Sequence, residues 1–173
     1  MRREFGKVIT ELAEKDSRIV VLSGDYYSQM QGFMEKFPKR FFNVGICEQS
    51  MIGIAAGMAL EGLKPYVYTI TPFLLERPFE QVKLDVVLQK ANVKLVGFSD
   101  YPNHGPTHAS VVVLGLAKLI NDYATSYLGK NPKGEHLLCY IPKDAMETRD
   151  SVVESYNDNR PAIISLKWDK NYK

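Results

Sequence analysis

Cysteine is scarce in this sequence, and neither sign of charge dominates. The two cysteines, Cys47 and Cys139, are too few for a disulfide framework and lack the spacing of a metal site. Both are predicted to be buried thiols in a reducing compartment. Lysine and arginine number 22 against 20 aspartate and glutamate residues, a formal net charge of +2. This balance gives no reason to expect nucleic acid or a membrane as a partner.

Long apolar segments are missing as well. Apolar runs such as residues 111–120 are too short to cross a bilayer, and the charged residues 1–5 lack the apolar run of a signal peptide. The 173 residues are enough for one domain with a sizeable core and few for two. Hydrophobic residues make up 45% and charged residues 24%, close to the globular average. The sequence therefore predicts a single cytoplasmic domain over residues 1–173.

Several motifs of common enzyme classes are absent. Neither G-x-G-x-x-G nor G-x-x-x-x-G-K-[ST] occurs, so no glycine-rich loop is available to cradle the phosphates of a nucleotide. No G-x-S-x-G sequence is present to form the nucleophile elbow of a serine hydrolase. The classes of protein that depend on these motifs are not indicated.

What the sequence does contain is an alternation of short apolar segments with helical patterns. This alternation predicts βαβ units, and hence an α/β fold with a mostly parallel sheet covered on both faces. The predicted strands are residues 19–22, 41–46, 65–71, 93–98, 136–141 and 162–166, and the predicted helices are residues 5–12, 51–60, 73–90 with an interruption near Pro78, a helix beginning within 111–120, and 142–156. Ligands of such sheets bind beyond the carboxyl ends of the strands, where residues 23–28, 47–49 and 99–108 place polar groups.

Glu48 is the first candidate for chemistry. It lies between an apolar strand and a helix rich in small residues, so its carboxylate is expected to be poorly solvated and suited to sharing a proton. The alternative is a structural carboxylate that satisfies free N–H groups at the start of the helix. The local pattern favours the structural role.

Two histidines lie four residues apart in a loop rich in glycine and proline. His104 and His108 flank Gly105-Pro106, which prevents the helix that a zinc-binding pair at this spacing requires. They are therefore either exposed loop residues or groups that transfer protons or bind an oxyanion. The loop position favours a functional role.

Residues 41–57, FFNVGICEQSMIGIAAG, resemble the pyrimidine-binding domain of the transketolase family. The similarity is closest to C-terminal-section transketolases and deoxyxylulose-phosphate synthases. Further segments resemble the family in the same order and extend the similarity over nearly the whole chain: residues 2–6, 20–25, 73–82, 105–108 and 142–148. The resemblance implies the thiamine-diphosphate-binding fold, a three-layer α/β sandwich.

The resemblance also implies thiamine diphosphate as a cofactor, for which the protein supplies orientation and electrostatics. In the family, the glutamate that matches Glu48 hydrogen-bonds N1′ of the aminopyrimidine and helps to activate the cofactor. The resemblance therefore favours a functional role for Glu48, whereas the local pattern favours a structural one. Phe73 matches the aromatic residue that stacks on the pyrimidine. His108 matches the loop histidine that faces substrate oxygens and assists proton transfer. Arg77 and Tyr68 are also expected beside the cofactor. The residues expected beside the substrate are His104, Asp25 and Arg2.

The sequence departs from the family's pattern in several places. His104 stands where the family usually has an acidic residue, and the loop of residues 99–104 is shorter than usual. Ile70 replaces an expected second stacking aromatic, although Tyr68 is close by, and residues 123–135 resemble an insertion. Activation of the cofactor is therefore better supported than acceptance of an ordinary sugar phosphate.

The family holds the diphosphate of the cofactor on another domain, through Mg²⁺ and a Gly-Asp-Gly motif. This sequence has no Gly-Asp-Gly, and Asp158-Asn159 does not form such a motif. The resemblance thus implies a separately encoded diphosphate-binding subunit that holds Mg²⁺, in an α₂β₂ assembly, and no metal ligand in this chain.

Three functions follow from these expectations. The first is the pyrimidine-binding subunit of a split transketolase-like enzyme that transfers a two-carbon ketol unit between sugars. The second keeps the cofactor but decarboxylates a 2-oxo acid with carboligation, as deoxyxylulose-phosphate synthases do. The third is a non-catalytic subunit that binds a partner. Glu48 and His108 argue against the third, because a scaffold needs neither.

Overall fold

The computed structural model describes residues 1–98, 105–109 and 112–167. Within them six strands form one sheet in the order β2-β1-β3-β4-β6-β5, and every neighbouring pair is parallel. The carboxyl ends of the strands therefore lie along one edge of the sheet, as the alternating pattern predicts. The strands are β1 Ile19–Ser23, β2 Phe41–Asn43, β3 Lys64–Ile70, β4 Lys94–Phe98, β5 Leu138–Tyr140 and β6 Ala162–Leu166.

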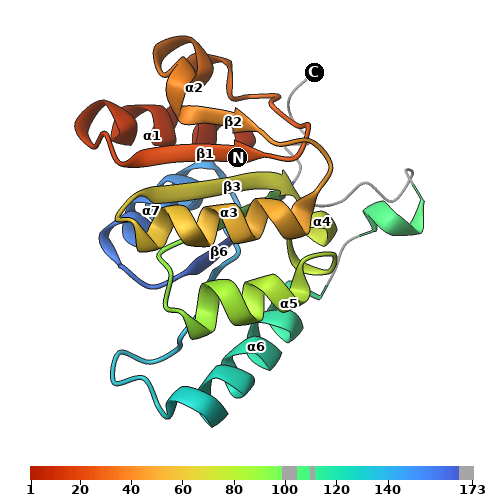
Figure 1. Ribbon diagram of the computed structural model, residues 1–173. Helices are drawn as coiled ribbons and strands as arrows, with labels where there is room; N and C mark the ends of the chain where they lie inside the picture. Colours follow the sequence, from red (N-terminus) through yellow and green to blue (C-terminus); the bar gives the residue numbers. More distant parts are fainter. Residues whose placement is uncertain (99–104, 110–111, 168–173) are drawn as a thin grey trace.

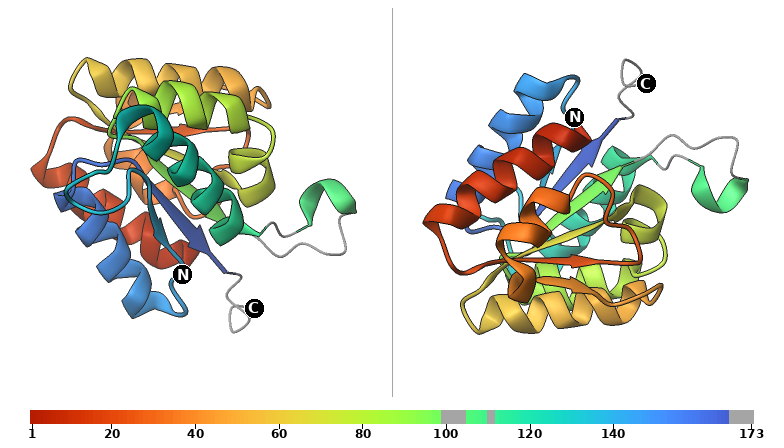
Figure 2. Two further views of the ribbon diagram at one scale, coloured as in Figure 1. Left: turned by 90° about the horizontal axis from the view of Figure 1, so that it is seen from below. Right: turned by 90° about the horizontal axis from the view of Figure 1, so that it is seen from above.

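Helices cover both faces of the sheet (Figures 1 and 2). Helices α1, α2 and α7 pack on one face, and α3, α6 and the π-helix η2 pack on the other. Their bounds and those of the shorter helices are α1 Arg2–Lys15, α2 Gln31–Lys36, η1 Pro38–Arg40, α3 Glu48–Leu60, α4 Thr71–Leu75, α5 Phe79–Gln81, η2 Val82–Leu88, η4 Pro106–His108, α6 Val113–Leu128 and α7 Ala145–Asn157. The predicted three-layer α/β sandwich is confirmed.

The central strands are apolar because both of their faces are buried. In β1, Val20 and Leu22 belong to the core cluster on the α3 side, whereas Ile19 and Val21 belong to the cluster on the α1 side. Side chains alternate between the faces of a strand, so a strand covered on both sides needs apolar residues at every position. No helix in the described residues is long and apolar enough to cross a membrane.

The helix expected over residues 73–90, with an interruption near Pro78, is divided into α4, α5 and η2, and the break falls at the predicted place. Other predicted boundaries are wrong. The strand expected over residues 41–46 ends at Asn43, because Gly45 has a φ of 76° and turns the chain. The next helix begins at Glu48 and not at Met51. Helix α2 has no counterpart among the predicted elements.

Gly97 lets α4 lie directly against the sheet. A Cβ atom at this position in β4 would be 2.6 Å from Thr71 Oγ1 and 3.1 Å from Thr71 Cα, closer than packed atoms approach. Thr71 is the first residue of α4. The missing side chain therefore fixes where α4, and with it Phe73, lies at the carboxyl edge of the sheet.

Candidate functional site

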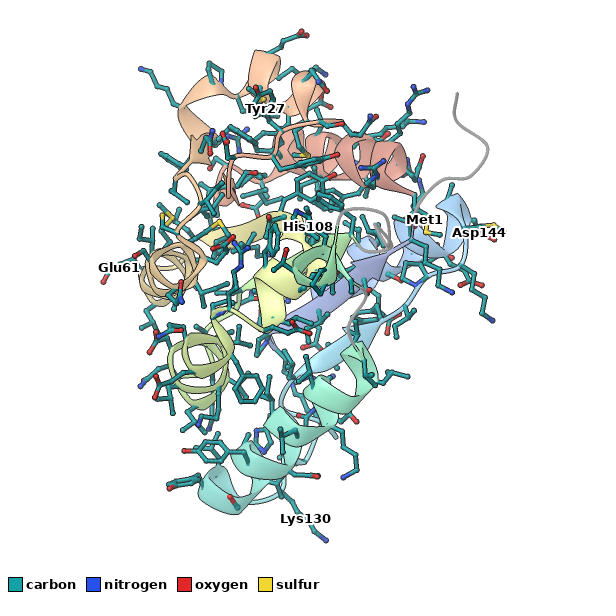
Figure 3. The ribbon with its side chains drawn as sticks, turned by 90° about the vertical axis from the view of Figure 1, so that its right-hand side faces the viewer. Met1, Tyr27, Glu61, His108, Lys130 and Asp144 are labelled. Atoms are coloured by element: carbon teal, nitrogen blue, oxygen red, sulfur yellow. The ribbon has the colours of Figure 1, made fainter. Side chains whose placement is uncertain are left out.

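Three separate segments meet at the carboxyl edge of the sheet. Helix α3 begins there after β2, α4 begins there after β3, and η4 lies in the connection that follows β4. Figure 3 views the molecule from this edge, with His108 labelled. Each segment contributes one or two of the side chains that the sequence singles out.

Glu48 is buried and bound to a cation. It is 3% exposed, and its Oε1 accepts a hydrogen bond of 2.7 Å from Arg77 Nη1. The Arg77 side chain is 36% exposed, so the guanidinium lies between the buried Glu48 carboxylate and the solvent. A charge-assisted hydrogen bond of this length compensates for part of the cost of burying the carboxylate.

The turn before α3 aims Glu48 at this cation. Val44 N donates to Ser23 O, Gly45 N donates to Asn43 Oδ1, and Cys47 N donates to Gly45 O. Cys47 is the N-cap residue of α3 and makes no capping hydrogen bond with its side chain. The Glu48 carboxylate accepts its hydrogen bond from Arg77, in the turn between α4 and α5, and not from an N–H group of α3. The structure thus gives Glu48 a partner other than the free N–H groups of the helix, and its role beside a cofactor stays a prediction.

Phe73, Arg77 and His108 extend the site from Glu48. The guanidinium carbon of Arg77 lies 3.6 Å from the centre of the Phe73 ring, a stacked cation–π contact. The Phe73 ring in turn meets the His108 ring edge-on, with centroids 4.8 Å apart. Thr107 Oγ1 lies 3.0 Å from His108 Nδ1 and orients the imidazole. We call these four residues, Glu48, Arg77, Phe73 and His108, the Glu48 cluster.

Two of the residues expected beside the substrate lie in nearby parts of the structure. Asp25 follows β1 with a φ of 57°, and its backbone N and side chain both hydrogen-bond the amide of Asn43. Arg2 is buried, and its Nη1 donates to the Tyr26 hydroxyl at 2.8 Å. Their assignment to the substrate stays a prediction.

Tyr68 and His104 do not add to the geometry of the cluster. Tyr68 is fully buried in the core on the α1 side, where its ring stacks on Phe5 and also contacts Phe98. Its expected contact with the cofactor stays a prediction. His104 lies outside the described residues.

The described residues contain no group of three or more His, Cys, Asp or Glu side chains that could hold a metal ion. Both cysteines are free thiols and half-buried. Burial raises the pKa of the Cys139 thiol to about 11, which keeps it protonated and unreactive at neutral pH.

The contact between Glu48 and Arg77 is the feature that sequence reasoning misses. The resemblance places Arg77 beside the cofactor, but its partner lies 29 positions away, beyond the reach of any local pattern. One signal for the stack is available in the sequence. Phe73 and Arg77 are four residues apart, a spacing that brings side chains together within a helix, although in the structure Arg77 lies in the turn that follows α4.

This fold, with a buried glutamate joined through Arg77 to an aromatic ring at the strand ends, defines an α/β protein with a candidate site at the carboxyl edge of its sheet. The family described as "Transketolase, pyrimidine binding domain" matches residues 1–170. The chain belongs to this family, as the resemblance of residues 41–57 predicts.

Two kinds of curated relative match the chain. A 1-deoxy-D-xylulose-5-phosphate synthase from Dictyoglomus thermophilum is 34% identical over 171 residues, 96% of this chain and 25% of that protein. One subunit of an apulose-4-phosphate transketolase from Actinobacillus succinogenes is 36% identical over 130 residues, 64% of this chain and 42% of that protein. The chain therefore spans less than half of the length of each of these relatives.

Solved structures agree with this assignment. A structure described as "Split gene transketolase, inactive beta4 tetramer" superimposes with a TM-score of 0.79 at 29% identity, over 96% of this chain and 50% of that chain. A transketolase from Campylobacter jejuni superimposes with a TM-score of 0.77 over 96% of this chain and 25% of that chain, at 19% identity, and shows a shared fold.

Proposed function

We propose that this chain is the pyrimidine-binding subunit of a thiamine-diphosphate-dependent, transketolase-like enzyme that transfers a two-carbon ketol unit between sugars. The single observation that carries the proposal is the Glu48 cluster, in which the Arg77 guanidinium links a buried carboxylate to a flat aromatic face. Membership of the family supports the choice of cofactor.

The cluster fits an aminopyrimidine. Such a ring needs a flat apolar surface to stack on and a carboxylate that hydrogen-bonds its ring nitrogen. The Arg77 guanidinium is itself a flat group with N–H donors, and it already stacks on the Phe73 ring and donates to the Glu48 carboxylate. The site thus accepts a planar donor group, and Arg77 would have to give up one or both contacts before a cofactor ring could use them.

Each residue then has a defined task. When bound, thiamine diphosphate supplies the nucleophilic carbon that carries the two-carbon unit. Glu48 holds a proton on the ring nitrogen of the pyrimidine, and its burial keeps water from competing for that proton. Phe73 fixes the plane of the ring. His108, in contact with Phe73, faces the substrate oxygens and moves protons to and from them.

A separate subunit completes this site in our proposal. It binds the diphosphate and Mg²⁺, and it joins this chain in an α₂β₂ assembly. Two relatives support this arrangement, because one is a single subunit of a transketolase and another is described as a split-gene transketolase. The test is co-purification with a candidate chain from the same genome that carries a Gly-Asp-Gly motif. Tight binding of the cofactor and turnover by the isolated chain would contradict the proposal.

A second candidate function keeps the same site. Relatives that are 34% and 36% identical are deoxyxylulose-phosphate synthases, which favours decarboxylation of a 2-oxo acid followed by carboligation. Parallel assays of the reconstituted pair with pyruvate and with ketose phosphates separate the two. Consumption of pyruvate without ketol transfer would replace the first function with the second.

Glu48→Gln tests the role of the cluster directly. The variant keeps the size of the side chain and a hydrogen-bonding oxygen but cannot share a proton with the ring. We expect the reconstituted pair to lose exchange of the acidic C2 proton of the cofactor by about 100-fold or more. Far-UV circular dichroism serves as the control for folding. Exchange at the wild-type rate in the variant would overturn the assignment of Glu48, and a wild-type pair that shows neither exchange nor turnover on any sugar would favour the non-catalytic role.

A further inference from the structure

A cavity of about 410 Å³ lies at the edge of the sheet opposite the Glu48 cluster. Its walls come from three connections that each precede a strand: residues 87–90 before β4, residues 128–136 before β5, and residues 158–161 before β6. Because the strands are parallel, these connections meet at the amino edge of the sheet. The cavity is thus separate from the site at the carboxyl edge.

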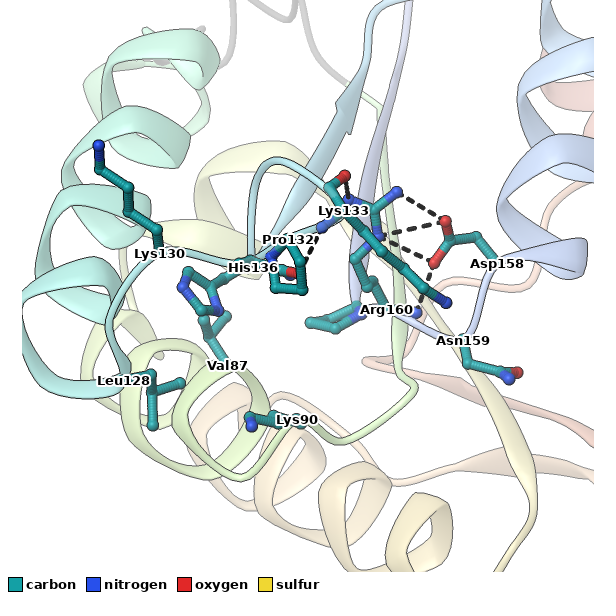
Figure 4. Close-up of a pocket in the computed structure, with 12 residues that line it drawn as sticks. Val87, Lys90, Leu128, Lys130, Pro132, Lys133, His136, Asp158, Asn159 and Arg160 are labelled. Atoms are coloured by element: carbon teal, nitrogen blue, oxygen red, sulfur yellow. Dashed lines mark hydrogen bonds and ion pairs between the residues drawn. The ribbon is translucent and has the colours of Figure 1, made fainter.

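Cationic side chains dominate its lining. Lys90, Lys130, Lys133 and Arg160 face one carboxylate, Asp158, among the described lining residues, which gives a formal net charge of +3 when histidine is counted as neutral. Figure 4 shows Lys90 on one side of the cavity and Lys133 with Arg160 on another, while Lys130 points outward. Lys90 and Lys133 therefore supply charge from different walls.

The one carboxylate is already neutralised. The Arg160 guanidinium donates to both oxygens of Asp158, from Nε to Oδ1 at 3.0 Å and from Nη2 to Oδ2 at 2.7 Å, and this contact lowers the pKa of Asp158 to about 2. Within the described residues no ion pair joins Lys90 or Lys133 to a carboxylate. Two lysine charges are left for a ligand.

Hydrogen bonds tie together the connections that frame the cavity. Arg160 Nη1 donates to Lys133 O at 2.6 Å and to Glu135 O at 3.0 Å, which ties the connection before β6 to the one before β5. The buried ammonium of Lys94 donates to Asp158 O and Arg160 O, at 2.8 Å and 2.6 Å. A cationic cavity held in shape by such contacts loses little conformational entropy when a ligand enters.

The remaining lining decides the chemical class of the ligand. The His136 ring donates from Nε2 to Gly129 O at 2.9 Å, and its other face lies in the cavity near Val87 and Leu128 (Figure 4). Pro132 and Pro161 add further apolar surface. A bare inorganic anion would leave this surface unused, whereas a small organic molecule that carries a phosphate would contact both parts. The volume matches that of a small-molecule site.

We propose that this cavity binds a small phosphorylated organic molecule, with Lys90 and Lys133 holding the phosphate and the apolar side of the cavity holding its carbon atoms. The proposal does not depend on the function of the Glu48 cluster.

The test measures thermal unfolding of the chain at low ionic strength with glycerol 3-phosphate, inorganic phosphate and glycerol as probes. We expect glycerol 3-phosphate to raise the melting temperature in a concentration-dependent manner, inorganic phosphate to act more weakly, and glycerol to have no effect. The double variant Lys90→Gln/Lys133→Gln is expected to bind glycerol 3-phosphate about tenfold more weakly. These lysines are exposed, so the variant should fold normally.

Two controls make the outcome decisive. Lys39→Gln/Lys143→Gln removes the same charge from exposed sites outside the cavity and should bind like the wild type. Glu48→Gln should also bind like the wild type, which separates this proposal from the proposed function. Equal binding of both lysine double variants, equal binding of inorganic and organic phosphate, or no binding of either would overturn the proposal.

Discussion

The guanidinium of Arg77 contacts two chemically different groups at once. It donates to the Glu48 carboxylate and stacks on the Phe73 ring. Arginine suits this place better than lysine, because its charge is planar and spread over several N–H donors. The residue thus stabilises a buried carboxylate while it shields the aromatic face that the proposed cofactor requires.

Removal of this cation should destabilise the isolated chain. Arg77→Met leaves the Glu48 carboxylate buried without its partner, and we expect the free energy of unfolding to fall by about 1–2 kcal/mol. Adding Glu48→Gln to Arg77→Met should recover part of the loss, because the buried charge is then gone. Urea unfolding of the two single variants and the double variant measures the coupling. Strictly additive effects would show that the contact contributes no stability.

The sequence predicts which residues belong to the candidate site, but it does not predict which of their side chains touch. Glu48, Phe73 and His108 can be named because each stands in a block that resembles the family. The pairing of Glu48 with Arg77 cannot, since it depends on how α4 packs against β4, where Gly97 leaves room for Thr71. That close approach is a tertiary effect.

The side chain of Lys94 connects β4 with the segment before β6 at the amino edge of the sheet. It is the first residue of β4, it is 1% exposed, and its ammonium bonds the carbonyls of Asp158 and Arg160 ahead of β6. Burial lowers the pKa of this lysine to about 7 from an ordinary value of 10.5. In the folded protein the ammonium of Lys94 is desolvated, which disfavours its charged form, whereas in the unfolded chain it is hydrated.

This shift predicts a definite dependence of stability on pH. Between about pH 7 and about pH 10 the unfolded chain binds more protons at Lys94 than the folded chain, so the contribution of this group to stability rises with pH. Lys94→Met should be less stable, because two carbonyls lose their donor, and its melting temperature should rise less across this interval. Lys39→Met, at an exposed position, should keep the wild-type slope. Identical slopes for wild type and Lys94→Met would contradict the lowered pKa.

Predicted elements match the structure where burial sets the pattern. The predicted bounds of strand β6 are the observed ones, because residues 162–166 are apolar or small and buried at every position. The segment of residues 82–88 falls within a predicted α-helix and is a π-helix. No hydrophobic periodicity distinguishes the two over a single short segment, because the difference lies in backbone hydrogen bonds that packing selects.

The whole molecule carries its two candidate sites at opposite edges of one sheet. The Glu48 cluster lies at the carboxyl edge, and the cationic cavity lies at the amino edge. The sheet and its central strands separate them, so ligands at the two sites do not compete for space. Helices α5 and η2 connect the two edges directly, since they run from the turn that holds Arg77 to Val87 in the cavity lining.

The surface beside α3 bears on the proposed assembly. Ile54 is 43% exposed on α3, and Gly57, three residues further along the helix, is exposed with open space where a Cβ atom would lie. A small residue at this place lets a neighbouring chain approach. Ile54→Asp should weaken assembly with a Gly-Asp-Gly-containing partner by about tenfold or more, since a carboxylate would be desolvated in the interface. Leu119→Asp is the matched control, because Leu119 is 55% exposed on α6, a different helix on the same face of the sheet.

Analytical size exclusion of the mixed chains measures this difference, and circular dichroism of each variant confirms that both fold. Loss of assembly in Ile54→Asp with normal assembly in Leu119→Asp would place the partner on α3, the helix that begins at Glu48. Normal assembly in both variants would exclude the outer face of α3 as the contact. Equal loss in both would show a general effect of added charge, and the position of the partner would then have to be sought on another surface.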